Sequence, residues 1–146
     1  MAAVNHHGGP LTGNRQRSDA FRCQTERMTQ PLPSAEAFAL ASLVTPTEHG
    51  IASRVLAKTS GGNLTLFAFD VGQGLTEHTS PFEAFVLVLE GRFTVTIGGT
   101  TVVGLPGTIV GLPATVPHAL EAMERSRMLL VMLRDQKTET QRPGLL

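Results

Sequence analysis

The chain has 146 residues, a size typical of one domain, and its 41% hydrophobic content is sufficient for an apolar core. Twelve basic and twelve acidic residues give a formal net charge of zero, which argues against nucleic acid as the main partner because no basic stripe can neutralise phosphates. No apolar run approaches the ~20 residues of a membrane span, so we expect no membrane partner.

The N-terminal segment, residues 1–33, is polar and shows no hydrophobic period of 2 or 3.6, so we expect a flexible tail. Translation could start at Met1 or at Met28 in this segment. Its lone cysteine, Cys23, can form no intrachain disulfide. The segment also lacks the apolar stretch of a secretory signal, so the expected location is the cytoplasm.

Residues 34–44 predict a short helix or turn. Ser34 is a plausible N-cap, Leu40 and Leu43 fall on one face, and Pro46 stops the helix.

From Ile51 onward the chain has the texture of an all-β protein, with short runs of β-branched and aromatic residues between Gly, Pro, Asn and Asp. Gly98-Gly99 lies between two threonine-rich runs and predicts a tight hairpin turn. Nine strands at this spacing indicate a sandwich or a barrel, and periodicity alone does not choose between them. We predict strands near residues 51–58, 64–70, 75–79, 84–90, 92–97, 100–104, 108–112, 118–123 and 127–134.

Three of these runs, residues 64–70, 84–90 and 127–133, are apolar almost throughout instead of alternating. Such strands are covered on both faces. The outer cover would be a second sheet, the N-terminal segment or another subunit, and the last of these favours a homodimer.

Two spaced fragments carry the chemistry. In the first, five residues separate Gly72 from His78, Ser80 follows two positions on, Ala84 comes four after that, and six residues separate Ala84 from Gly91. In the second, five residues separate Gly107 from Pro113, and His118 comes five positions after Pro113, with Thr115 between them and Ala122 four positions beyond His118.

These fragments resemble the two motifs of the cupin superfamily, and the chain looks like its small single-domain bacterial members. The resemblance implies a double-stranded β-helix, or jelly-roll barrel, over residues 34–136, followed by a C-terminal tail, residues 137–146. It also implies that His78 and His118 point into the barrel, where the family binds a divalent metal.

The chain departs from the family pattern where Ser80 replaces the second histidine and Ala84 replaces the glutamate. Two histidines are too few for a tight metal site, and Glu83 is the candidate third ligand. A shift of one residue turns a side chain to the other face of a strand, so Glu83 reaches the site only if the chain bulges at residues 81–82. Otherwise the histidines are hydrogen-bonded core residues and Glu83 is a solvated charge.

The expected function is that of a small-molecule-binding protein that holds one divalent metal ion, Mn, Fe, Ni, Cu or Zn, at His78, His118 and Glu83. One alternative is a metal-dependent oxygenase or isomerase of a small oxygenated substrate, in which Glu83 could act as the base instead. Another is a metal-free barrel that binds a sugar or other small ligand, or that serves as a structural dimer module.

Overall fold

The computed structural model describes residues 31–135. The predicted C-terminal tail, the possible start at Met28 and all but the last three residues of the predicted N-terminal tail lie outside this range. Within it, no helix has the length and apolar composition needed to cross a bilayer.

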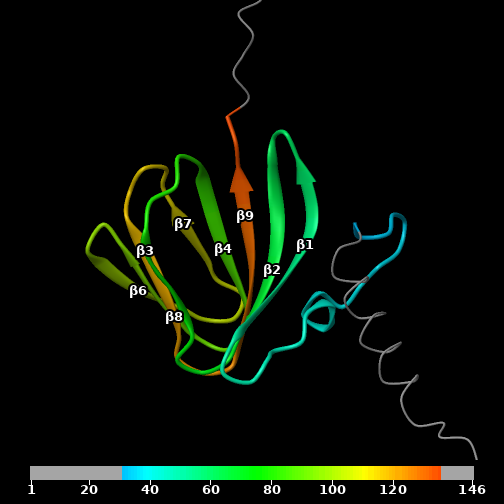
Figure 1. Cartoon of the computed structure of the whole chain (residues 1–146), viewed down its shortest axis with the longest axis horizontal. Helices are drawn as coiled ribbons and strands as arrows, with labels where there is room; N and C mark the ends of the chain where they lie inside the picture. The colour runs from blue at the N-terminus through cyan, green and yellow to red at the C-terminus, as the bar shows by residue number, and fades with distance from the viewer. Residues whose placement is uncertain (1–30, 136–146) are drawn as a thin grey trace, which may run out of the picture. The chain divides into compact units, whose positions relative to one another are not determined.

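Within residues 31–135, nine antiparallel strands form two sheets (Figure 1). One sheet has five strands in the order β1-β2-β9-β4-β7, and the other has four in the order β3-β8-β5-β6. The strand bounds are β1 Ile51–Thr59, β2 Gly62–Phe69, β3 Gly74–His78, β4 Glu83–Glu90, β5 Phe93–Ile97, β6 Thr100–Gly104, β7 Ile109–Leu112, β8 His118–Ala122 and β9 Ser126–Leu133. No predicted strand end differs from these bounds by more than two residues.

The pairing is nested around one hairpin. Strand β5 pairs with β6 across Gly98-Gly99, and outside this hairpin β4 pairs with β7, β3 with β8 and β2 with β9. The chain is therefore one long hairpin folded over on itself into two sheets, which is the jelly-roll topology. The predicted all-β double-stranded β-helix is confirmed. Both central glycines have positive φ, 55° and 83°, as a tight two-residue turn requires.

The main core lies between the two sheets and contains Phe69 of β2, Val86 of β4 and Phe93 and Val95 of β5. The rings of Phe69 and Phe93 meet edge to face with centroids 5.2 Å apart. Along β4 the inward positions are buried, and the residues between them are only partly covered. Strand alternation therefore decides which side chains of the first sheet can reach the interior.

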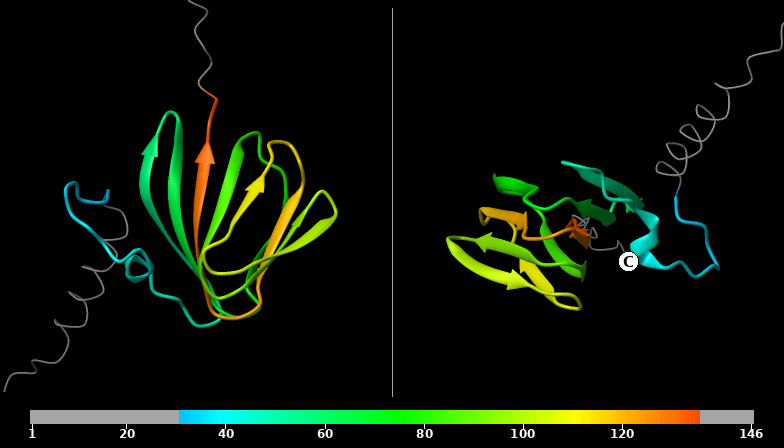
Figure 2. Two further views of the ribbon diagram at one scale, coloured as in Figure 1. Left: turned by 180° about the vertical axis from the view of Figure 1, so that it is seen from behind. Right: turned by 90° about the horizontal axis from the view of Figure 1, so that it is seen from below.

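A second apolar cluster covers the outer face of β2. Leu66 of β2 and Leu56 of β1 pack there with Val44, and Leu40 and Leu43 lie against them. Figures 1 and 2 show the segment before β1 beside the β1 edge of the five-stranded sheet. For β2, whose continuous apolar run predicts a cover on its outer face, that cover includes residues 40–44 of the same chain, which precede β1.

The predicted helix over residues 34–44 is too long. Only Leu40–Leu43 is helical, as a four-residue 3-10 helix, and the hydroxyl of Ser42 donates to the carbonyl of Ala39 at 2.6 Å. Ala35 has a φ of 59°, which interrupts a right-handed helix. Val44 is extended, and its burial against the sheet is gained at the expense of a longer helix.

Candidate functional site: a histidine pair at the barrel wall

His78 is the last residue of β3 and His118 is the first of β8, and the two are direct partners across these strands. Their Nε2 atoms lie 3.2 Å apart, and the ring centroids are 4.4 Å apart at an interplanar angle of 70°. The structure therefore brings together the two histidines that the sequence singled out. His118 is buried, at 6% exposure, whereas His78 is exposed, so the pair joins the interior to solvent.

A β-bulge in β3 makes this pairing possible. Leu75 pairs with Leu120 and His78 pairs with His118, so β3 uses one residue more than β8 over the same stretch. In a regular strand, residues 75 and 78 would face opposite sides. The extra residue turns His78 to the side of Leu75, toward the interior. The sequence carried no clear sign of this bulge.

The second nitrogen of each ring is held by a backbone carbonyl. Nδ1–H of His78 donates to the carbonyl of Thr76 at 2.8 Å, and Nδ1–H of His118 donates to that of Val116 at 3.2 Å. A carbonyl only accepts, and a neutral imidazole has one proton. If both rings are neutral, both Nε2 atoms carry lone pairs that face each other, and a metal ion bound by both nitrogens stabilises the arrangement. One added proton would instead make the contact an N–H···N hydrogen bond.

The pair borders a small interior cavity of about 50 Å³. Ser80 and Ala84, the two departures from the family pattern, line the same cavity as both imidazoles. The remaining wall is hydrophobic and comes from β3, β7, β8 and β9; it consists of Leu75, Leu112, Leu120, Met128, Leu130 and Met132. The space is sufficient for a few water-sized groups.

The structure does not bring Glu83 to the histidines. Glu83 is exposed and is absent from the cavity wall, because β4 runs in regular register with β9 and its alternation turns Ala84 inward. The bulge proposed for residues 81–82 does not form; the bulge lies in β3 instead. Among residues 31–135, no three histidine, cysteine, aspartate or glutamate side chains are grouped so that they could hold a metal ion.

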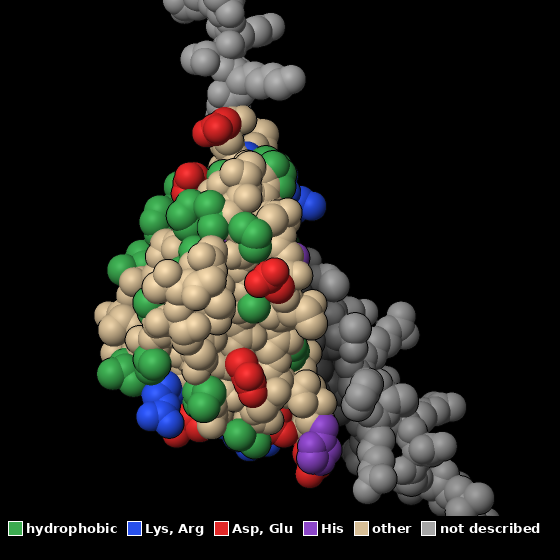
Figure 3. Space-filling model, turned by 90° about the vertical axis from the view of Figure 1, so that its left-hand side faces the viewer, with side chains coloured by type: hydrophobic (Ala, Val, Ile, Leu, Met, Phe, Trp, Pro, Cys, Tyr) green, Lys and Arg blue, Asp and Glu red, His purple; other side chains and the backbone are tan. Residues whose placement is uncertain are grey.

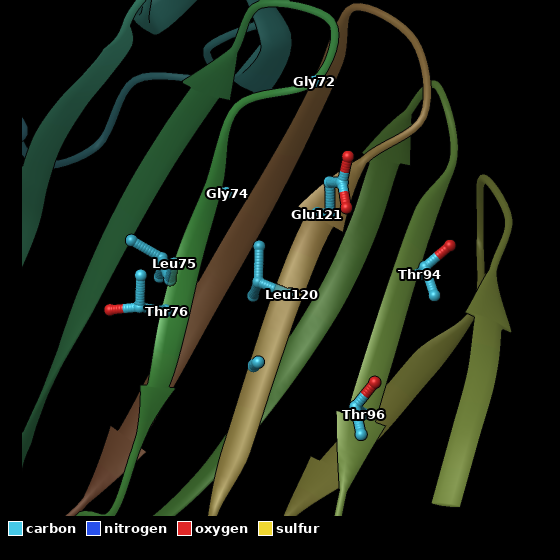
Figure 4. Close-up of a pocket in the computed structure, with 9 residues that line it drawn as sticks. Gly72, Gly74, Leu75, Thr76, Thr94, Thr96, Leu120 and Glu121 are labelled. Atoms are coloured by element: carbon cyan, nitrogen blue, oxygen red, sulfur yellow. The ribbon is translucent and has the colours of Figure 1, made fainter.

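A larger hollow of about 400 Å³ lies on the outer face of the second sheet. Figure 4 shows it lined by Thr94 and Thr96 of β5, Glu121 of β8 and the backbone around Gly74. The groove is open to solvent, and Glu121 is the only titratable group that lines it. Its size exceeds that of the interior cavity, but its groups converge on no common point, so the histidine pair is the better candidate site.

Asp70, just after β2, is a buried charge that sequence reasoning missed. Its carboxylate accepts the backbone N–H of His49 at 2.7 Å and of Val71 at 2.9 Å, and Arg125 Nε–H donates to it at 3.3 Å. These hydrogen bonds, that of His49 first, hold the pKa of Asp70 below its usual value. The network is structural, because it joins the loop before β1 to the loop before β9.

The two sheets and their nested pairing define a jelly-roll barrel protein, and the histidine pair beside the interior cavity is its candidate site. A family model described as a cupin domain matches residues 65–133. A conserved protein of unknown function from Streptococcus pyogenes is 32% identical with a TM-score of 0.70, over 73% of this chain and 94% of that one. A cupin superfamily protein from Desulfitobacterium hafniense is 27% identical with a TM-score of 0.68, over 73% and 97% of the two chains.

A Cupin 2 conserved barrel domain protein from Leptotrichia buccalis is 33% identical with a TM-score of 0.64, over 66% of this chain and 47% of that one. A comparison with curated proteins found no match. The chain belongs to the cupin superfamily.

Proposed function

We propose that this cupin binds one metal ion between Nε2 of His78 and Nε2 of His118, and that the metal in turn holds a small ligand at the cavity. The observation that carries the proposal is the pair of facing Nε2 atoms, 3.2 Å apart, on rings whose Nδ1 atoms lie within hydrogen-bond distance of backbone carbonyls. Orientation of a ligating histidine by a backbone carbonyl is the usual arrangement around protein metal ions.

The separation of the nitrogens suits a shared metal. Two bonds of about 2.0–2.1 Å that meet at 90–109° place their nitrogen atoms roughly 2.9–3.4 Å apart. The measured 3.2 Å lies inside that range. Imidazole nitrogen is a ligand for Zn, Cu, Ni, Fe and, less strongly, Mn.

The cavity wall favours binding over acid–base catalysis. Apart from the imidazoles, Ser80 is its one residue with a polar side chain, and Leu75, Leu112 and Leu130 exclude water from the space beside the rings. When bound, a metal ion would polarise an oxygen atom of the ligand. Because Glu83 lies outside the cavity, the oxygenase or isomerase alternative lacks the base that the sequence suggested for it.

A metal-free pair is the second candidate. A distance of 3.2 Å between the Nε2 atoms also suits an N–H···N hydrogen bond, in which one proton is shared by the two rings. The histidines would then be structural. The barrel would bind a sugar or other small ligand without a metal, or would act as a structural dimer module.

Elemental analysis of full-length protein purified without an affinity tag separates these candidates. We expect about one equivalent of metal in the wild type, and its loss in the His78→Ala/His118→Ala double variant. The matched control is His49→Asn, which alters an exposed loop histidine at a position with a φ of 55°, where asparagine is tolerated. Metal-free protein that shows no thermal shift with Mn, Fe, Ni, Cu or Zn would refute the proposal.

A homodimer and a cytoplasmic location stay predictions of the sequence. Support for the dimer comes from exposed hydrophobic residues, which include Val103 on β6, Leu105 after it and Ile109 on β7. Figure 3 shows hydrophobic side chains spread over one side of the molecule with few charged groups between them. Light scattering coupled to size exclusion measures the mass, and a mass of one chain at micromolar concentration contradicts the dimer.

A further inference from the structure

Two methionines of β9 share the cavity with the histidine pair. Met128 and Met132 both line it, because they lie an even number of residues apart on a strand whose alternate residues face the interior. The cavity therefore contains two thioether side chains as well as two imidazoles. Thioether sulfur is thus available as a metal ligand where the cavity wall has no cysteine and no carboxylate.

Met132 is the better placed of the two. It is the direct partner of Ala84 across β4 and β9, and Ala84 holds the position where the family pattern has its glutamate. Directly paired residues have Cβ atoms about 4.5–5.5 Å apart, so the methionine can reach into the space that the missing carboxylate leaves. Met128 pairs with Val88, roughly 13 Å further along the strand at 3.3 Å a residue, and is fully buried in the main core.

We propose that the cavity is a copper(I) site formed by Nε2 of His78, Nε2 of His118 and Sδ of Met132. The inference rests on the proposed metal at the histidine pair and names which metal it is. Thioether sulfur is a soft ligand that selects Cu(I), and imidazole also binds copper. Methionine has three rotatable side-chain bonds, so its sulfur can adjust to the ion.

The lack of carboxylates in the cavity wall also favours a Cu(I) ion. Two neutral imidazoles and a thioether carry no negative charge, and the residues that line the cavity include no carboxylate. Transfer of a cation from water into such a space is costly, and the cost rises steeply with the charge of the ion. A monovalent ion therefore suits this ligand set better than Zn²⁺ or Mn²⁺, which a carboxylate at position 84 would favour.

The test measures the affinity of full-length, metal-free protein for two metals. Cu(I) is titrated without oxygen against a chromophoric Cu(I) chelator, and Zn(II) against a zinc chelator. The variants are Met132→Leu, Met128→Leu at the other cavity methionine, and His78→Ala/His118→Ala, with Met123→Leu as a matched control at an exposed methionine outside the cavity. The double histidine variant also measures background binding by residues outside the site, including His6, His7 and Cys23 of the N-terminal segment.

We expect the wild type to bind one Cu(I) above that background and more tightly than Zn(II). Met132→Leu should weaken Cu(I) binding by about tenfold or more while it leaves Zn(II) within about twofold. Met123→Leu, outside the cavity, should change neither affinity, and Met128→Leu should weaken Cu(I) binding less than Met132→Leu does. Met and Leu have similar volumes, so the methionine variants should fold, and circular dichroism of the metal-free proteins checks this.

If the wild type binds neither metal above the background, the proposed function and the copper assignment both fail. If Zn(II) binds at the histidines but Cu(I) binds no more tightly and Met132→Leu has no effect, the proposed function stands and the copper assignment is overturned. Loss of Cu(I) in Met128→Leu instead would overturn the choice of Met132. X-ray absorption of the wild type with Cu(I) gives a test that needs no variant, since the absence of a sulfur neighbour of copper contradicts the inference.

Discussion

Position 84 lies in the wall of the candidate site, where the family pattern has a glutamate. Ala84 is buried at 3% exposure and lines the cavity beside both imidazoles, whereas its neighbour Glu83 is exposed on the other face of β4. One methyl group stands where a carboxylate would complete a three-ligand set. The residue at position 84 therefore decides whether the cavity wall contains a carboxylate.

Ala84→Glu should convert the cavity to a site for harder divalent ions. We expect Zn(II) and Mn(II) affinity to rise by about tenfold or more, since a carboxylate joins two imidazoles. The stability of the metal-free variant should fall by about 2 kcal/mol, because a carboxyl group is buried without a partner. Chelator competition and thermal unfolding measure the two effects.

The control for this variant is Glu83→Gln, which should leave both metal affinity and stability unchanged. A loss of Zn(II) binding in Glu83→Gln would show that the exposed carboxylate reaches the site after all, and would contradict the description of the cavity.

Asp70 should make stability depend on pH in the acid range. Its pKa is lowered in the folded protein by the backbone N–H groups of His49 and Val71 and by Arg125. A lowered pKa means that the stabilisation is fully present above the usual aspartate value of about 3.9 and is lost as the pH falls through the lower folded value. Asp70→Asn should therefore have a lower Tm than wild type at pH 7, and the gap should narrow below about pH 4.

Thermal unfolding by circular dichroism between pH 7 and pH 2.5 measures this gap, with Glu121→Gln on the open groove as the control. A gap between wild type and Asp70→Asn that stays constant over the whole range would contradict the assignment.

At the scale of elements, local patterns predicted the strands and non-local pairing determined the site. Alternation such as that of Phe93, Val95 and Ile97 needs no knowledge of the fold, and every predicted strand is present. The bulge in β3 depends on its pairing with β8, some forty residues away, so the spacing of Leu75 and His78 alone could not reveal it. The sequence alone could not identify Met132 as a cavity residue for the same reason, because only the β4–β9 register places it opposite Ala84.

The short helix or turn expected in residues 34–44 is present but shorter than that range, and Glu83 is not at the site; both outcomes have local physical reasons. The helix over residues 34–44 gives way to the 3-10 helix Leu40–Leu43 because burial of Val44 and its neighbours on β2 outweighs helix propensity. Glu83 stays outside because β4 keeps a regular register at that end. Side chains of β4 alternate regularly between its two faces, so Glu83 and Ala84 face opposite sides.

The β5–β6 hairpin gives a direct test of the topology at this scale. Gly99 has a φ of 83°, and a Cβ there would meet no atom within 4 Å, so Gly99→Ala introduces backbone strain without a clash. We expect a loss of about 1 kcal/mol and a fall in Tm of about 4–8 °C. Gly111→Ala in β7 is the control, because its Cβ would make ordinary contact with Phe85 at 3.7 Å. Equal effects of the two changes in thermal unfolding would argue against the tight turn.

At the level of the whole molecule, the second apolar cluster attaches residues just before β1 to the barrel. Leu40, Leu43 and Val44 pack on the barrel, whereas residues 1–27 were predicted from sequence to be a flexible tail. Deletion of residues 1–27 should therefore leave the Tm nearly unchanged. Deletion of residues 1–46 should lower it strongly, since it exposes the apolar outer face of β2. A large drop with the shorter deletion would contradict the tail prediction.

Anomalous diffraction from crystals of the wild type grown with the metal shows directly whether a metal ion lies between the two histidines. Data collected at the absorption edge of the bound element locate the ion independently of any variant. If the two histidines bind a metal ion, we expect one anomalous peak about 2.0–2.1 Å from Nε2 of both His78 and His118. Crystals of metal-treated protein without a peak there, in which the rings keep a direct Nε2–Nε2 contact, would contradict it and establish the metal-free pair.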